Sequence, residues 1–149
     1  MADSESNGEL NTGLLLYIPY RWLENRVFDA LAKAGFDDIT TAQMKLMQRI
    51  GANGTRLTEL AEQAQVTKQT AGFLVDQLEK AGCVERVPDP TDKRARLVRI
   101  AERGQRAIPI AQATVTGIEA EWEAHLGAAR MAQLRRALTE LREITDPYA

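Results

Sequence analysis

Two short helical patterns lie close together in the middle of this chain, and they constrain its fold more than any other feature. Thr58 can cap a first helix that runs through Gln65, and Thr67 can cap a second, so that only Gln65 and Val66 join the two. The apolar residues of the second pattern recur at helical spacing: Ala71, Leu74, Val75 and Leu78. The sequence therefore predicts a helix-turn-helix whose second helix presents a polar N-terminal turn.

After Gly82 the spacing of apolar residues changes from a helical period to a period of two. Residues 83–87 and 96–100 both mix β-branched residues with charges, as strands do, and the segment PDPTDKRA between them predicts a charged hairpin. The net charge of −2 conceals a local excess, because residues 93–106 hold six Lys and Arg against a single Glu. This basic segment can attract a polyanion although the whole chain is acidic.

Longer amphipathic patterns flank this central region. Residues 14–34 and 102–127 each predict a long helix, and residues 131–141 predict a final one. A capping box of Thr40 and Gln43 predicts a short helix between the first of these and the central pair. The apolar stripes of the first and last helices exceed what a chain of 149 residues can cover alone, so we expect a second subunit to cover them.

Several classes of protein are excluded by what the sequence lacks. The longest apolar run, residues 14–19, is far short of the roughly 20 residues needed to cross a bilayer. The acidic, polar start does not resemble an export signal, so we expect a cytoplasmic protein. A single cysteine, Cys83, and a single histidine, His125, exclude multi-His zinc sites and CxxC pairs. We therefore expect neither an enzyme nor a bound cofactor.

The run TKQTAGFLVDQLEKAGCVERVPDPTDKRARLVRIAERG resembles the recognition helix and wing of the MarR family of winged helix-turn-helix transcriptional regulators. By the order of its elements, the resemblance covers roughly residues 14–145. It implies a homodimer with interleaved terminal helices and with one winged domain per subunit over successive grooves of a palindromic operator. Two residues depart from the family pattern: Phe73 stands where a basic or polar residue is common, and Ala101 replaces a helix-capping hydroxyl residue.

The expected fold is mainly α with a small β-hairpin wing. It would comprise a winged helix-turn-helix domain plus N- and C-terminal dimerisation helices. Residues 1–12 would form a disordered N-terminal tail, and residues 38–101 the winged helix-turn-helix DNA-binding domain. Residues 13–37 and 102–149 would form the helical dimerisation region.

Two groups of residues are candidates for contact with double-stranded DNA. Those of the recognition helix are Thr67, Lys68, Gln69, Thr70, Gly72 and Phe73. Those of the wing are Asp92, Lys93, Arg94 and Arg96. A guanidinium suits a narrow minor groove, so Arg94 is the strongest candidate, and Asp92 would hold it by a charge-assisted pair. Lys93 and Arg96 would contact phosphates.

A group of aromatic, methionine and arginine residues is a candidate pocket for a small aromatic or phenolic effector, because related regulators bind such compounds between the dimerisation helices and the winged domain. Its members are Tyr17, Tyr20, Arg21, Met44 and Met47, with Trp22 nearby. Arg21 beside two tyrosines would suit a carboxylate or a phenolate. Core packing is the alternative interpretation of the same spacing.

The expected function is a homodimeric, sequence-specific DNA-binding regulator of transcription, a repressor released by a small ligand. A first alternative is a protein-interaction module with the same fold. A second is a redox-sensing regulator that uses Cys83, although a small packed side chain suits that position as well. Glu121 and His125 lie four residues apart and could bind a metal weakly, but such a pair is more often an ordinary surface contact.

Overall fold

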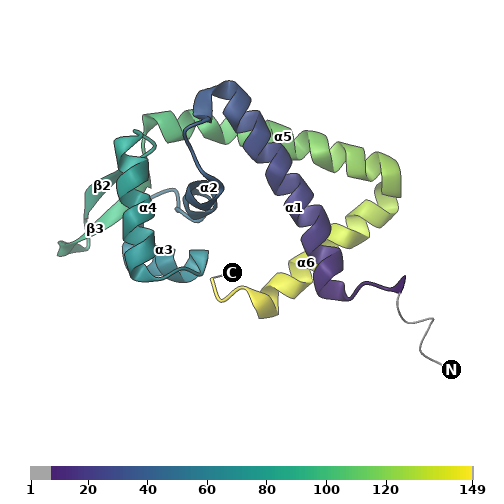
Figure 1. Cartoon of the computed structure of the whole chain (residues 1–149). Helices are drawn as coiled ribbons and strands as arrows, with labels where there is room; N and C mark the ends of the chain where they lie inside the picture. Colours follow the sequence, from purple (N-terminus) through teal and green to yellow (C-terminus); the bar gives the residue numbers. More distant parts are fainter. Residues whose placement is uncertain (1–7, 149) are drawn as a thin grey trace.

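The computed structural model of the chain describes residues 8–148. Its elements follow one another as α1 (Thr12–Leu31), the π-helical turn η2 (Ala32–Phe36), α2 (Thr41–Met47), β1 (Thr55–Arg56), α3 (Leu57–Ala64), α4 (Lys68–Lys80), β2 (Val84–Asp89), β3 (Asp92–Ile100), α5 (Glu102–Leu126) and α6 (Ala128–Thr145) (Figure 1). The fold is mainly helical with a small antiparallel sheet, which confirms the expected class. Most of the expected tail, residues 1–12, lies outside the described residues, and Thr12 already belongs to α1.

Helix boundaries follow the capping signals of the sequence closely. Asn11 caps α1 through its Oδ1, which accepts a hydrogen bond from Leu14 N at 2.9 Å. Both bonds of the predicted capping box at Thr40 and Gln43 are present at the start of α2. The first helix ends in η2, where Gly35 adopts a φ of 103°, a conformation that favours glycine.

The central helix pair differs from expectation at one end. The prediction that Thr58 caps its first helix was wrong, because α3 begins at Leu57 directly after β1 and Arg56 occupies the N-cap position. Gln65 takes a left-handed conformation with a φ of 57°, which turns the chain between α3 and α4. Thr67 caps α4 as predicted, since its Oγ1 accepts a hydrogen bond from Thr70 N at 3.0 Å.

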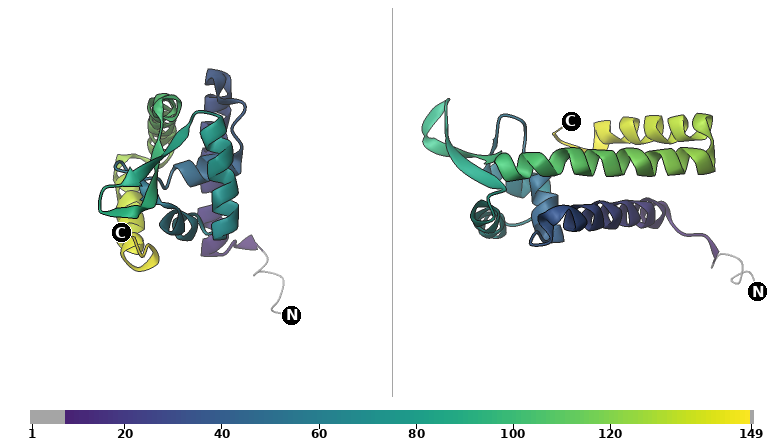
Figure 2. Two further views of the ribbon diagram at one scale, coloured as in Figure 1. Left: turned by 90° about the vertical axis from the view of Figure 1, so that its left-hand side faces the viewer. Right: turned by 90° about the horizontal axis from the view of Figure 1, so that it is seen from above.

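The sheet contains three strands in the order β1-β3-β2, and both pairs are antiparallel. The strands of the hairpin extend further than the sequence pattern predicted, so that only Pro90 and Thr91 lie between β2 and β3. Strand β1 was not predicted, because two residues show no alternation. Figure 2 shows that the tip of the hairpin projects away from the helical body. We call this tip, residues 88–96, the wing.

The terminal helices form the other half of the molecule. Helix α6 turns back along α5 after Gly127, and α1 packs against α5 (Figure 2). Trp22 of α1 and Trp122 of α5 lie with their ring centroids 6.3 Å apart. The chain end returns to the winged domain, where Tyr148 donates a hydrogen bond to Glu62 of α3 at 2.7 Å. No helix within residues 8–148 is long and apolar enough to span a bilayer.

Candidate nucleic-acid interface and ligand cavity

The first turn of α4 is open to solvent. Thr67, Lys68, Gln69 and Thr70 are all exposed. The hydroxyls of Thr67 and Thr70 lie 2.9 Å apart in a hydrogen bond, which orders this turn, while the side chains of Lys68 and Gln69 extend from it. A helix N-terminus carries a partial positive charge, so this end of α4 is suited to an anionic partner.

The two remaining candidates on α4 differ in their surroundings. Phe73 is 61% exposed, although it is the largest apolar side chain of the helix. Gly72 faces α3 instead, because a Cβ built there would lie 3.8 Å from Leu57 Cδ2. The structure thus places Phe73 on the solvent side with Lys68 and Gln69, and Gly72 on the packed side.

The three basic candidates of the wing, Lys93, Arg94 and Arg96, are exposed on β3. Arg94 and Arg96 lie two residues apart, so they share a face of the strand. Asp92 holds Arg94 differently from the prediction: its Oδ1 accepts a hydrogen bond from the backbone N of Arg94 at 3.0 Å, and its Oδ2 lies 3.9 Å from Arg56 Nη2. Asp92 therefore orders the backbone at the tip rather than the Arg94 guanidinium.

A second carboxylate, missed by sequence reasoning, fixes the base of the wing. Asp89 is only 6% exposed, and its Oδ2 accepts hydrogen bonds from Arg56 Nε at 2.9 Å and pairs with Nη2 at 2.8 Å. Its Oδ1 accepts from the backbone N and the Oγ1 of Thr91 at 2.8 and 2.7 Å. The bonds from Thr91 and then from Arg56 lower the pKa of Asp89 to about 2. Since the ionic partners lie 33 residues apart, no local pattern could have indicated them.

Another arginine joins the two halves of the molecule. Arg103 of α5 donates to both oxygens of Asp38, at 2.9 and 2.6 Å, and to the carbonyl oxygens of Gly35 and Ala81. Its guanidinium carbon also lies 5.1 Å from the centre of the Phe36 ring. The end of the first helix, the turn after α4 and the start of α5 are therefore tied at one point.

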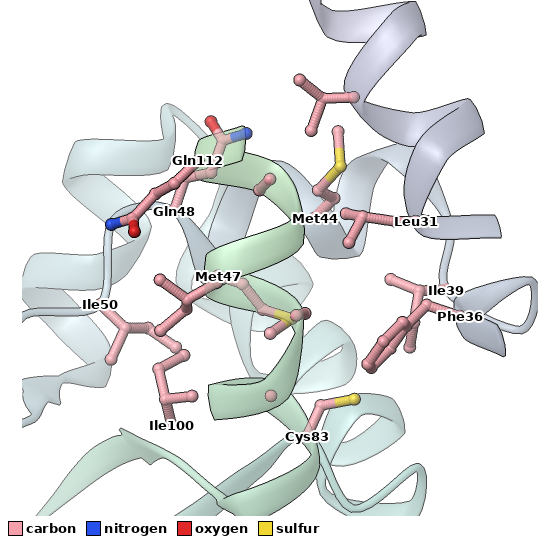
Figure 3. A pocket seen from close by; sticks show the side chains of 15 residues that line it. Leu31, Phe36, Ile39, Met44, Met47, Gln48, Ile50, Cys83, Ile100 and Gln112 are labelled. Carbon is pink, nitrogen blue, oxygen red and sulfur yellow. The ribbon is translucent and has the colours of Figure 1, made fainter. Parts of the chain in front are cut away.

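A cavity of about 440 Å³ lies where these same elements meet (Figure 3). Its lining comes from α1 and η2, from α2 and the loops that flank it, from Cys83 and Ile100, and from the first turns of α5. Met44 and Met47 line it, and their contact with a ligand stays a prediction. Helical spacing could not distinguish this cavity from an ordinary core, because its walls are apolar.

The other three ligand candidates, all on α1, do not reach this cavity. Tyr17 and Arg21 are exposed and line no described hollow. Tyr20 lines a separate hollow between α1, α5 and α6, and it donates a hydrogen bond to Glu24 at 2.7 Å. Partial burial, followed by the contact with Glu24, raises the pKa of Tyr20 to about 12. The structure therefore separates Arg21 and the tyrosines from Met44 and Met47.

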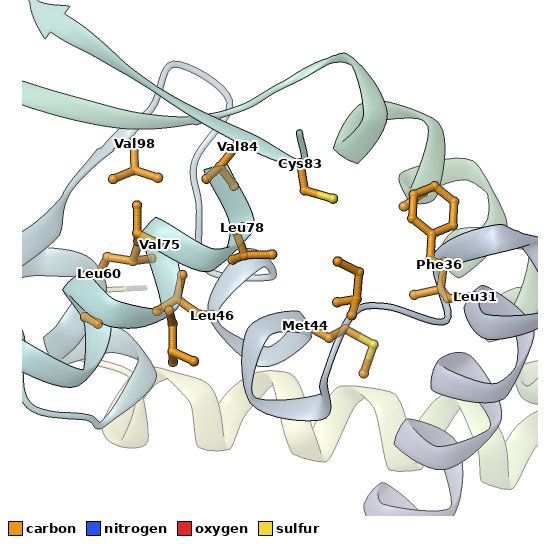
Figure 4. Close-up of a cluster of buried hydrophobic side chains, with 14 of the residues drawn as sticks. Leu31, Phe36, Met44, Leu46, Leu60, Val75, Leu78, Cys83, Val84 and Val98 are labelled. Atoms are coloured by element: carbon orange, nitrogen blue, oxygen red, sulfur yellow. The ribbon is translucent and has the colours of Figure 1, made fainter. Parts of the chain in front are cut away.

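Cys83 is packed as a small core residue. Its side chain is fully buried and belongs to the same cluster of buried apolar residues as Leu78, Val84 and Phe36. Figure 4 shows it pointing into this cluster. Burial raises the pKa of the Cys83 thiol, although Arg103 Nη1 lies 3.8 Å from Sγ and acts in the opposite direction. A raised pKa and a buried sulfur both disfavour reaction with peroxide.

Glu121, which the sequence suggested as a metal ligand together with His125, is bonded to an arginine instead. Glu121 accepts a hydrogen bond from Arg26 of α1 at 3.3 Å. Within residues 8–148, no group of three His, Cys, Asp or Glu side chains is arranged to hold a metal ion.

Comparison with known proteins gives a family match and several similar structures. A family model described as the MarR family matches residues 39–95. The apo form of wild-type MarR from E. coli is 25% identical with a TM-score of 0.69, over 89% of this chain and 97% of that one. A MarR family protein from Mycobacterium tuberculosis in complex with salicylic acid is 27% identical with a TM-score of 0.65, over 91% and 98%. A transcriptional regulator from Thermotoga maritima is 26% identical with a TM-score of 0.63, over 90% and 93%. No curated protein matches the sequence.

Proposed function

Because this chain belongs to the MarR family of transcriptional regulators, we propose that it is a homodimer that binds a palindromic DNA operator, represses transcription and is released by a small ligand. The observation that carries this proposal is the joint exposure of the α4 N-terminal turn and of the wing arginines on one small domain. The turn offers Gln69 and Lys68 to the major groove, and the wing offers Arg94 to a neighbouring minor groove.

The basic residues of the wing support DNA as the partner. Lys93, Arg94 and Arg96 have no salt bridge within residues 8–148, whereas most acidic groups of the hairpin are already neutralised. Asp89 pairs with Arg56, and Glu85 pairs with Arg99 at 2.5 Å. The unpaired cations at the tip are therefore available to phosphates, which would make binding dependent on salt.

A second copy of the chain is proposed from the apolar surface of the terminal helices. Exposed apolar side chains gather at the start of α1 and along α6: Leu14, Leu15, Leu16, Ile18, Leu134, Leu138, Leu141 and Ile144. A hollow of about 1020 Å³ is lined by four of them, Leu15, Leu16, Leu134 and Leu138, together with Tyr20 and Trp122. A surface of this kind is unfavourable in water and is suited to a two-fold partner. We therefore propose residues 13–37 and 102–149 as the dimerisation region and residues 38–101 as the DNA-binding domain.

Release by a small ligand is supported by the cavity between these two regions. The relative from M. tuberculosis has salicylic acid in its structure. In this chain, a ligand in the cavity would contact α1, α2 and α5 together. It would therefore favour one orientation of the winged domain over another.

Selection of bound sequences from random duplex DNA, followed by titration of the enriched duplex, tests the proposal. We expect an imperfect palindrome with half-site centres about 10 base pairs apart, bound by one dimer. The logarithm of the affinity should fall linearly with the logarithm of the salt concentration. Failure to enrich any duplex would favour the alternative of a protein-interaction module.

A further inference from the structure

None of the side chains that line the 440 Å³ cavity is charged, and the only carboxamides among them are those of Gln48 and Gln112. The volume is in the range of drug-sized ligand sites, and two methionines can adapt its shape. The cavity is therefore large enough for an organic ligand but offers it no ion pair.

The cations closest to this lining in the sequence either have other partners or lie outside the lining. Lys45 lies 3.5 Å from the buried carboxylate of Glu24, and Arg49 lies 3.9 Å from Asp146. Arg103 is held by Asp38 and by two carbonyl oxygens. Arg26 and Arg99 pair with Glu121 and Glu85, while Lys33 and Arg106 are exposed and do not line the cavity. An anion enclosed by this lining would therefore face no cation of the lining, and an unpaired buried charge is costly.

The polar groups that do line the cavity are two carboxamides. Figure 3 shows Gln48 and Gln112 together at one end, while Phe36 and Cys83 lie at the other. Both glutamines are exposed, and neither carboxamide is hydrogen-bonded to another residue within 8–148. Both can donate and accept, so they suit an uncharged polar group such as an amide or a hydroxyl.

We propose that this cavity binds a neutral, bicyclic or similarly bulky aromatic molecule, with its rings against the methionines and Phe36 and its one polar group at Gln48 and Gln112. This differs from the carboxylate or phenolate that Arg21 would suit, since Arg21 is outside the cavity. The inference deepens the proposed function, on which it rests, by assigning the chemical class of the releasing ligand.

The test compares 2-naphthamide with 2-naphthoate, two ligands of the same shape that differ in charge at pH 7. Isothermal titration calorimetry on the full-length protein measures both. We expect naphthamide to bind with a dissociation constant lower by roughly tenfold or more, because the carboxylate finds no cation. Equal or tighter binding of naphthoate would overturn the proposal, and so would the absence of naphthamide binding up to its solubility limit.

A charge introduced at the polar end makes the test specific for the cavity. Gln112→Arg should lower the dissociation constant of naphthoate by roughly tenfold, through a charge-assisted pair. Gln105→Arg is the matched control, because it adds the same charge on an exposed turn of α5 that does not line the cavity. The two variants should differ in naphthoate affinity, and equal affinities would contradict the assigned location. Gln112 is exposed, so its substitution should leave the fold intact.

A blocking variant and a DNA titration complete the design. Ala111→Trp should abolish naphthamide binding by filling the cavity, with circular dichroism as the check on folding. Naphthamide should also release the enriched duplex. If the protein binds duplex DNA but not naphthamide, the present inference fails and the proposed function stands. If it binds naphthamide but no duplex DNA, the proposed function fails while the chemistry assigned to the cavity holds.

Discussion

Replacement of Arg94 by alanine is the most direct test of the wing as a reader of DNA. The side chain is exposed at the tip, and it forms no salt bridge with another described residue, so its loss should leave the fold unchanged. Any change in DNA binding would then report a contact with DNA rather than an indirect structural effect.

The expected magnitude follows from the symmetry of the dimer. A groove contact of this kind contributes about 1–3 kcal/mol to the free energy of DNA binding. A symmetric dimer makes the contact twice, so the variant would lose about 2–6 kcal/mol of binding free energy. Lys93 and Arg96 beside it can recover part of the loss by moving toward the phosphates. We therefore expect the affinity to fall by roughly tenfold or more at fixed salt.

Fluorescence anisotropy of the enriched duplex measures this loss, with two comparisons. Arg136→Ala removes the same side chain from the exposed surface of α6 and should leave the affinity within about twofold of the parent. Lys93→Ala should weaken binding to specific and random duplexes alike, because a phosphate contact carries no sequence information. Equal binding by Arg94→Ala and the parent would show that the wing is not a reader and that DNA contact rests on α4 alone.

Four further predictions follow from the same structure. Asp92→Ala should weaken duplex binding in the anisotropy assay although it removes a negative charge, because the Arg94 amide loses its acceptor at 3.0 Å; tighter binding would contradict this role. The pKa of Asp89 is lowered from 3.8 to about 2, so its contribution to stability is complete above pH 4 and should be lost as the pH falls toward 2; urea unfolding of Asp89→Asn should show a smaller loss across this range. Gly104→Ala should lower the free energy of unfolding by about 1–3 kcal/mol in urea, because a Cβ would overlap the Cys83 carbonyl oxygen; unchanged stability would refute that packing. Deletion of residues 128–149 should give monomer or aggregate in sedimentation velocity, whereas a folded dimer would exclude α6 from the interface.

The winged domain could be predicted from the sequence because its signals are local. Thr40 and Thr67 cap their helices through residues three positions ahead, and such bonds leave a readable spacing. The strand pair after Gly82 was predicted from alternation alone, but both strands were predicted too short at the turn: the first was ended at Val87 instead of Asp89, and the second was begun at Arg96 instead of Asp92. The hairpin continues to Asp89 because Thr91 and Arg56 satisfy that carboxylate at the turn.

The features that hold the two halves together could not be predicted, because they join distant segments. Arg103 and Asp38 lie 65 residues apart, so no local pattern in the sequence links them. The cavity was hidden for another reason: an apolar side chain that lines a hollow and one that fills a core produce the same periodicity. Met44 and Met47 line the cavity, but the tyrosines of α1, which the family resemblance grouped with them as ligand candidates, do not.

The chain segment from the wing to the cavity contains no flexible break. Strand β3 starts at the wing with Asp92 and ends at Ile100, which lines the cavity, and Ala101 alone separates it from α5. The backbone N of Ala101 donates to the Cys83 carbonyl oxygen at 2.9 Å, and the absence of a side chain at Gly104 lets α5 approach the same group. We therefore expect a ligand that displaces the first turns of α5 to move β3 with it, because a single residue connects the two elements. Strand β3 would carry this motion from Ile100 at the cavity to Arg94 near its other end.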